Sequence, residues 1–197
     1  MNKEINKISD GIFIVENFIS KSSADFLIKS IGSHLVETPN EHVLCGPSGS
    51  KSTPLDQVGE YGNSEEYNIG IDMFNSLLFS INQLISDKFN LQHRVKSSFL
   101  GCMLPGAFNK MHMDNRIIDD NGEILIRENY AFDKSGLLYL NEDYSGGELY
   151  FSKQNLLIKP NTGSLIFFEG DENKPHEVKE VTSGSRYNMV TFYEPVN

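Results

Sequence analysis

Tryptophan is absent from this sequence of 197 residues, and cysteine occurs only twice. Two cysteines, Cys45 and Cys102, are too few for the disulfide framework of a small secreted domain. Long apolar runs are also lacking, so the sequence predicts no membrane span. The polar start of the chain, from Met1 to Glu4, predicts no secretion signal. These absences favour a cytoplasmic, intracellular protein built as one compact domain.

Positive charge is the other shortage. The chain has 17 Lys and Arg residues against 27 Asp and Glu residues, which gives a net charge of -10. A surface of this sign repels a phosphate backbone, so we expect no nucleic-acid partner. The oligomeric state stays open at this level.

Three of the residues that are present form a pattern typical of a metal site. His112 and Asp114 are separated by one residue, and His176 follows far downstream. Alternate side chains of a β-strand point to the same face, so His112 and Asp114 can hold one ion together. Two imidazoles and one carboxylate make the facial triad of a non-heme iron(II) oxygenase, which leaves open positions for a co-substrate and dioxygen.

Arg186 follows His176 by ten residues and precedes the apolar run from Met189 to Tyr193. A guanidinium that is fixed in this place can bind a carboxylate through two parallel hydrogen bonds. The far carboxylate of a 2-oxoacid is therefore a candidate ligand for Arg186.

Short strands separated by turns are expected from residue 95 onwards, which favours a sandwich or a jelly roll. We therefore expect a core at 95–197 and a support region at 1–94, together forming one compact domain. Strands are predicted near 95–104, 110–114, 123–132, 136–141, 147–151, 155–158, 164–168, 176–181 and 186–194.

The support region is expected to contain a strand at 11–18 and two helices. Ser20 or Ser22 is a suitable cap for the first helix, and apolar residues recur at helical spacing from Ile71 to Phe89 in the second. Between the helices, about 40–68 is rich in Gly, Pro and Ser and is expected to be a long loop. Both a lid over the substrate and a merely mobile loop fit its composition.

Five stretches around these residues carry a resemblance to a known family. They are 104–115 with His112-Met113-Asp114, 136–143 with Tyr139-Leu140-Asn141, 145–151 with Gly146-Gly147-Glu148, 159–168 with Gly163-Ser164, and 175–178 with Pro175-His176. In this order they resemble the prolyl 4-hydroxylase-like branch of the iron(II)/2-oxoglutarate dioxygenases, over about residues 95 to 195. The resemblance implies a mainly β fold with flanking helices (α+β), whose core is a double-stranded β-helix, a cupin-like jelly roll.

The resemblance also implies the cofactors and the roles of the site residues. It implies Fe(2+), 2-oxoglutarate and O2, with ascorbate as a candidate reductant, and it assigns the C5 carboxylate of 2-oxoglutarate to Arg186. Relatives commonly place a co-substrate-binding Tyr nine residues before the first His, where this chain has Met103. Tyr139, in an expected inner strand, is the candidate replacement, with a packed core aromatic as the alternative. Relatives often have a Trp after the basic residue, in the region where this chain has Phe192.

The reaction implied is hydroxylation of a C–H bond, with release of succinate and CO2. A proline-containing peptide or protein is the substrate that the resemblance implies, which would make the chain similar to a peptidyl-proline 4-hydroxylase. One alternative keeps this chemistry but uses a free amino acid or a small metabolite. A second alternative is a non-catalytic, cupin-like metal-binding module. Succinate release with and without a proline-rich peptide separates the two enzyme readings.

Overall fold

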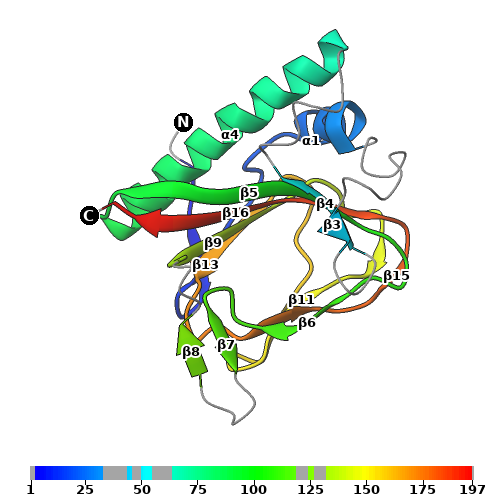
Figure 1. Cartoon of the computed structure of the whole chain (residues 1–197). Helices are drawn as coiled ribbons and strands as arrows, with labels where there is room; N and C mark the ends of the chain where they lie inside the picture. The colour runs from blue at the N-terminus through cyan, green and yellow to red at the C-terminus, as the bar shows by residue number, and fades with distance from the viewer. Residues whose placement is uncertain are drawn as a thin grey trace.

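An eight-stranded antiparallel sheet forms the main layer of the computed structural model (Figure 1). The structure describes residues 3–32, 44–45, 50–54, 64–118, 124–126 and 132–196. In spatial order, the sheet consists of β1 (Asn6–Ser9), β2 (Ile12–Val15), β13 (Leu165–Glu169), β9 (Lys134–Tyr139), β16 (Arg186–Pro195), β5 (His93–Met103), β4 (Ser50–Pro54) and β3 (Leu44–Cys45).

A four-stranded antiparallel sheet lies opposite β9, β13 and β16 in Figure 1. Its strands, in spatial order, are β12 (Leu156–Ile158), β11 (Leu149–Phe151), β14 (His176–Val178) and β6 (Asn109–His112). Two ribbons of two strands complete the description, β10 (Ser145–Gly146) with β15 (Val181–Ser183) and β7 (Arg116–Ile118) with β8 (Ile124–Ile126). Two facing antiparallel sheets confirm the mainly β, jelly-roll architecture that the sequence predicts.

Two helical segments cover the outer face of the large sheet (Figure 1). The hydroxyl of Ser20 accepts a hydrogen bond from the Ser23 amide and begins α1 (Lys21–Leu27), which continues into the π-helix η1 (Ile28–Gly32). Ser64 caps α4 (Glu65–Phe89) in the same way, and Asn90 ends it in the left-handed conformation. The predicted helix through Ile71 and Phe89 is thus confirmed. No helix in the described ranges has the length and hydropathy needed to cross a membrane.

Each central strand of the large sheet contributes to two separate hydrophobic clusters. On β16, Met189 and Tyr193 face the helices and join the cluster that contains Phe74 and Ile81 of α4. Val190 faces the small sheet and packs against the second cluster. Because side chains alternate along a strand, residues with the same parity as Val190 point into the space between the two sheets. Arg186 has this parity.

The segment expected to be a loop at about 40–68 contains two short strands. β4 pairs with β5, and β3 pairs with β4, so this part of the chain extends the large sheet at its edge. Pairing satisfies backbone groups of β5 from Phe99 to Met103 that would otherwise remain exposed at the sheet edge. Residues 46–49 and 55–63 lie outside the described residues, so the expected lid stays a prediction.

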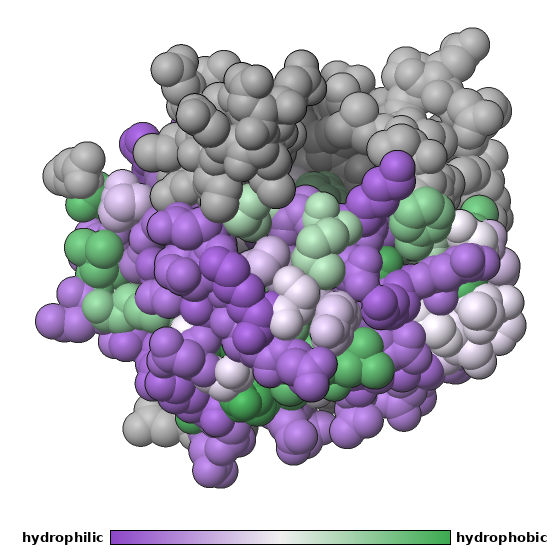
Figure 2. All heavy atoms as spheres, turned by 90° about the horizontal axis from the view of Figure 1, so that it is seen from below, coloured by the Kyte–Doolittle hydropathy of each residue, from purple (hydrophilic) through white to green (hydrophobic). Residues whose placement is uncertain are grey.

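The molecular face that lies at the bottom of Figure 1 is mainly polar where it is described. Figure 2 shows hydrophilic side chains over most of this face, with hydrophobic residues scattered between them. Scattered apolar residues are ordinary for a protein surface and mark no docking patch by themselves.

Candidate active site

The three predicted metal ligands come together on the small sheet. His112 ends β6, Asp114 follows it, and His176 begins β14, where it is the direct cross-strand partner of His112. The Nε2 atoms of His112 and His176 lie 3.5 and 3.7 Å from Oδ1 of Asp114. One donor atom from each residue falls in a group whose members are all within 4.8 Å of one another. This donor set, two imidazole nitrogens and a carboxylate oxygen, fits iron(II).

Backbone contacts orient both imidazoles toward the same point. Nδ1 of His112 lies 2.7 Å from the carbonyl oxygen of Lys110, and Nδ1 of His176 lies 2.9 Å from that of Lys174. A hydrogen bond from Nδ1 to a carbonyl oxygen leaves the lone pair of Nε2 free for a metal. The rings of Phe151 and Phe168 also pack against His176, with centroids 5.5 and 4.9 Å from its own.

Asp114 is a buried carboxylate that stays ionised. Ser135 on β9 donates a hydrogen bond to its Oδ2, so Oδ1 is the oxygen turned to the imidazoles. Burial by itself opposes ionisation, but His176, His112 and the Ser135 hydroxyl outweigh it and lower the pKa of Asp114 to about 2. An ionised Asp114 whose Oδ1 faces the two imidazoles is suited to bind a divalent metal through that one oxygen.

The two imidazoles differ in their exposure to solvent. Burial lowers the pKa of His176, although Asp114 opposes this effect, and a lowered pKa favours the neutral ring that binds metal. The His112 side chain is 40% exposed, whereas that of His176 is 6% exposed. The open side of the site therefore lies at His112, on the edge strand β6.

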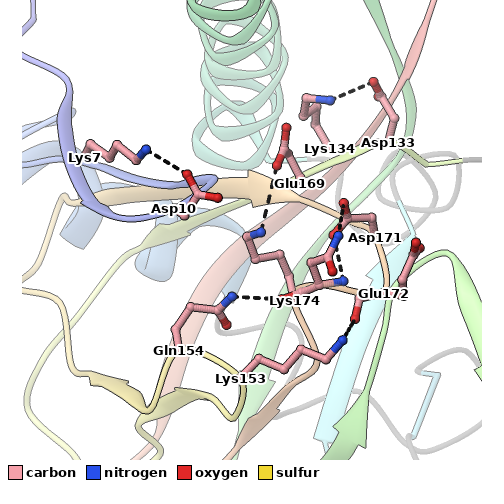
Figure 3. A network of polar contacts seen from close by, with 11 residues as sticks. Lys7, Asp10, Asp133, Lys134, Lys153, Gln154, Glu169, Asp171, Glu172 and Lys174 are labelled. Carbon is pink, nitrogen blue, oxygen red and sulfur yellow. Dashed lines mark hydrogen bonds and ion pairs between the residues drawn. The ribbon is translucent and has the colours of Figure 1, made fainter.

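The loop that leads to His176 is fixed by the turn between β11 and β12 (Figure 3). Lys153 donates to the carbonyl oxygen of Glu172 at 2.9 Å, and Gln154 donates to that of Asn173 at 2.8 Å. The buried ammonium of Lys174 lies 3.9 Å from a carboxylate oxygen of Glu169, at the end of β13. These contacts support the backbone from which the His176 ring is oriented.

Arg186 lies in the interior between the sheets, as its strand parity requires. Its side chain is 1% exposed, and its Nη2 donates to the Tyr139 hydroxyl at 3.0 Å. Nη1 lies 3.4 Å from the sulfur of Met103, and Nε has no partner. No carboxylate of the described residues pairs with this guanidinium. Because a buried, unpaired charge is costly, Arg186 suits an anionic ligand.

Met103, which stands where relatives commonly have a Tyr, and Tyr139, its candidate replacement, both contact Arg186. Tyr139 is fully buried on β9, and its ring centroid lies 4.9 Å from the guanidinium carbon. The hydroxyl accepts from Arg186 and keeps its own proton for a further acceptor. Met103 supplies only a weak sulfur acceptor. The Tyr139 hydroxyl thus lies next to Arg186, and its contact with the co-substrate stays a prediction.

Three interior residues were missed by the sequence analysis. Ser135 lies four residues before Tyr139 on β9 and therefore faces the same side, a strand alternation that could have identified it. Asn188 lies two residues after Arg186 on β16 and likewise faces the same side as Arg186. Tyr144 lies beside Arg186, and burial of its hydroxyl, which the interaction with Arg186 opposes, raises its pKa to about 12. No local pattern marks Tyr144.

Comparison with known proteins agrees with this arrangement. Residues 98–194 match the 2OG-Fe(II) oxygenase superfamily. Prolyl 3-hydroxylase 3 of Mus musculus is 42% identical over 92 residues, which cover 42% of this chain and 12% of that protein. Prolyl 3-hydroxylase 1 of Gallus gallus is 34% identical over 93 residues, which cover 43% and 13%. The chain thus spans only a small part of these curated relatives.

Solved structures share the fold over nearly the whole chain. The viral collagen prolyl hydroxylase from Paramecium Bursaria Chlorella virus-1, in its 2OG complex, has a TM-score of 0.68 and 18% identity and covers 97% of this chain and 100% of its own. A prolyl-4-hydroxylase of Pseudomonas putida has a TM-score of 0.62 and 21% identity and covers 95% and 94%. Residues 98–194 therefore form a domain of the 2OG-Fe(II) oxygenase superfamily, and the chain is prolyl hydroxylase-like in sequence and in fold.

Proposed function

We propose that this protein is an iron(II)- and 2-oxoglutarate-dependent dioxygenase that hydroxylates a peptidyl proline. The observation that carries the proposal is that two groups of residues suited to ligand binding lie together between the two sheets. One is the His112, Asp114 and His176 group, whose donor atoms converge within 4.8 Å. The other is Arg186, a buried cation whose Nε has no partner and which pairs with no carboxylate of the described residues.

Each residue has a separate role in this proposal. His112, Asp114 and His176 hold the iron, and Ser135 keeps one oxygen of Asp114 turned toward it. Arg186 and Tyr139 bind the C5 carboxylate of 2-oxoglutarate, which positions the co-substrate relative to the metal site. With both groups bound, oxidative decarboxylation of 2-oxoglutarate by O2 supplies succinate, CO2 and the oxygen atom for the substrate. The interior around Arg186 excludes water from the co-substrate's far end.

Proline is proposed as the target because of what the similar proteins are. The curated relatives include prolyl 3-hydroxylases, and the structural neighbours include a prolyl-4-hydroxylase. A prolyl hydroxylase of Trichoplax adhaerens, whose fold matches with a TM-score of 0.65 and 20% identity, was solved with a peptide fragment. A peptide or protein is therefore the substrate class to test first, and both C3 and C4 of proline are candidate positions.

The experiment is an incubation of the iron-loaded protein with 2-oxoglutarate, ascorbate and proline-rich peptides. We expect succinate release and one added oxygen atom on the peptide by mass spectrometry, and fragment or NMR analysis then assigns C3 or C4. Ascorbate is proposed as a reductant that restores iron(II), and omitting it tests that part. Succinate release without any peptide oxidation would point to another substrate. Iron binding without decarboxylation of 2-oxoglutarate would contradict the proposed dioxygenase activity and favour a non-catalytic metal-binding module.

An intracellular setting is proposed with the function. The sequence has only two cysteines, Cys45 and Cys102, too few for a disulfide framework, which suits a reducing compartment as a ferrous ion does. Fractionation of the native host, with detection of the protein in each fraction, tests this.

A further inference from the structure

His93 is a fully buried side chain at the start of β5, and both of its ring nitrogens face oxygen acceptors. Its Nδ1 lies 2.8 Å from the carbonyl oxygen of Leu91, and its Nε2 lies 3.2 Å from Oδ2 of Asp133. Neither a carbonyl oxygen nor an ionised carboxylate can donate, so both contacts are hydrogen bonds only when the ring carries both protons. The geometry therefore fits an ion pair between His93 and Asp133.

Both members of this pair are fixed by further contacts. The backbone amide of His93 donates to the hydroxyl of Ser86, near the end of α4, at 3.0 Å. Lys134 donates to the same Oδ2 of Asp133 at 2.9 Å (Figure 3), and its ammonium lies 4.6 Å from the ring centroid of Phe89. Two cationic groups thus converge on one carboxylate oxygen. These contacts tie the start of β9 to the end of α4.

Asp133 belongs to a segment that also contacts the loop of the metal ligand Asp114. Ser135, the second residue of β9, donates to Oδ2 of Asp114. The carbonyl oxygen of Phe132 accepts at 2.5 Å from the side chain of Asn115, the residue after Asp114. Residues 132–135 therefore adjoin the metal ligand on one side and the His93–Asp133 pair on the other.

The direction of the Ser135 hydroxyl depends on how β9 begins. One residue separates Ser135 from Asp133, so a displacement of the Asp133 backbone is passed on to Ser135. A hydrogen bond weakens steeply as its angle departs from the preferred range. A fixed Asp133 therefore favours the hydrogen bond that turns Oδ1 of Asp114 toward the imidazoles.

We infer that the His93–Asp133 pair is a positioning element of the metal site, which holds Ser135 in place against Asp114. The inference rests on the proposed function, which makes Asp114 an iron ligand. Neither His93 nor Asp133 belongs to the group of donor residues, so their effect on the metal passes through Ser135. The assignment extends the support of the metal site to the end of α4, on the outer face of the large sheet.

The test is anaerobic calorimetric titration of iron(II) into the whole protein. Asp133→Asn keeps the size of the side chain but removes its charge, so the Kd for iron(II) should rise about tenfold, as for loss of the Ser135 hydroxyl itself. His93→Phe, which keeps a ring without N–H groups, should have the same effect. Thr191→Val is the matched control, because it also removes a buried hydrogen bond to β9, the one to the Gly136 carbonyl oxygen. This control should leave the Kd unchanged.

A double-mutant cycle separates positioning from a general loss of stability. In a protein that already carries Ser135→Ala, Asp133→Asn should raise the Kd by less than about twofold, because the hydroxyl that it positions is gone. Circular dichroism should show that every variant is folded at the temperature of the titration. An unchanged Kd in both single variants, or an equally large further rise in the Ser135→Ala background, would overturn the inference and leave the proposed function standing. A wild-type protein that binds no iron(II) would overturn both.

Discussion

The two sheets of the jelly roll contribute to the site in different ways. The small sheet provides the proposed metal ligands at the end of β6, just after it and at the start of β14, two strands of four and three residues. The large sheet provides Arg186 and Tyr139 from β16 and β9, which have neighbours on both sides. Exposure follows the same division, since the His112 side chain is 40% exposed and Arg186 is 1% exposed.

This difference shows which end of the site the fold holds most firmly. The strands under Arg186 are covered by α4 on one face and by the small sheet on the other, and every residue of β9 is buried. The proposed metal ligands lie instead at and beside an edge strand, β6, where a large substrate can approach. Ser135 is the contact between the two halves, because it stands on β9 and bonds Asp114. The following substitutions test whether metal binding, co-substrate binding and stability are as separate as this arrangement implies.

The largest effect should come from removing a metal ligand. His176→Ala deletes one of three donors, so we expect iron-dependent 2-oxoglutarate turnover to be abolished while the fold is retained. Metal titration, succinate release and circular dichroism check this. Glu177→Gln is the matched control, because Glu177 is the next residue and pairs with Lys179 away from the metal. Full turnover by His176→Ala would remove the metal assignment.

Stability should depend on the helix-covered side of the large sheet. Phe74 is 1% exposed in the core, so Phe74→Ala should lower the free energy of unfolding by about 3–5 kcal/mol. Phe79 lies on the same helix but is 70% exposed, so Phe79→Ala should change the free energy of unfolding by less than about 0.5 kcal/mol. Denaturant unfolding measures both. Equal costs for the two substitutions would show that α4 is not packed as described.

Co-substrate binding should fail at Arg186 without a change at the metal. Arg186→Ala leaves the far carboxylate unpaired, which should cost about 2–5 kcal/mol of binding. The KM for 2-oxoglutarate should therefore rise by roughly thirtyfold or more, with an unaltered metal Kd. Arg94→Ala is the control, since Arg94 is an exposed residue of the same sheet that pairs with Glu194. An unchanged KM in Arg186→Ala would assign the carboxylate to another residue.

The smallest expected effect lies at the contact between the sheets. Ser135→Ala removes the hydrogen bond to Asp114, so the affinity for iron(II) should fall about tenfold, as for other residues that orient metal ligands. Ser98 is also buried in the large sheet, but its hydroxyl has no partner. Ser98→Ala should therefore leave metal affinity unchanged, and calorimetry compares the two. A loss of affinity as large in Ser98→Ala would mean that any cavity in this sheet disturbs the metal.

The sequence by itself determined which residues could form the metal site and which elements would carry them. The spacing of His112 and Asp114 and the periodicity of α4 are local patterns. A local pattern depends on the direction of side chains within one strand or helix, and this direction follows from the spacing of the residues in the sequence.

Only the tertiary structure decided which distant residues meet. Ser135 reaches Asp114, Met103 reaches Arg186 across 83 positions, and Asn188 lies between Tyr139 and Gly101 because of strand pairing. The expected strand at 176–181 became β14 and the start of β15, which belong to different sheets. Residues 50–54, expected within a loop, pair with β5. Pairing partners and register follow from how all strands bury their faces together, and no single segment of the sequence encodes that choice.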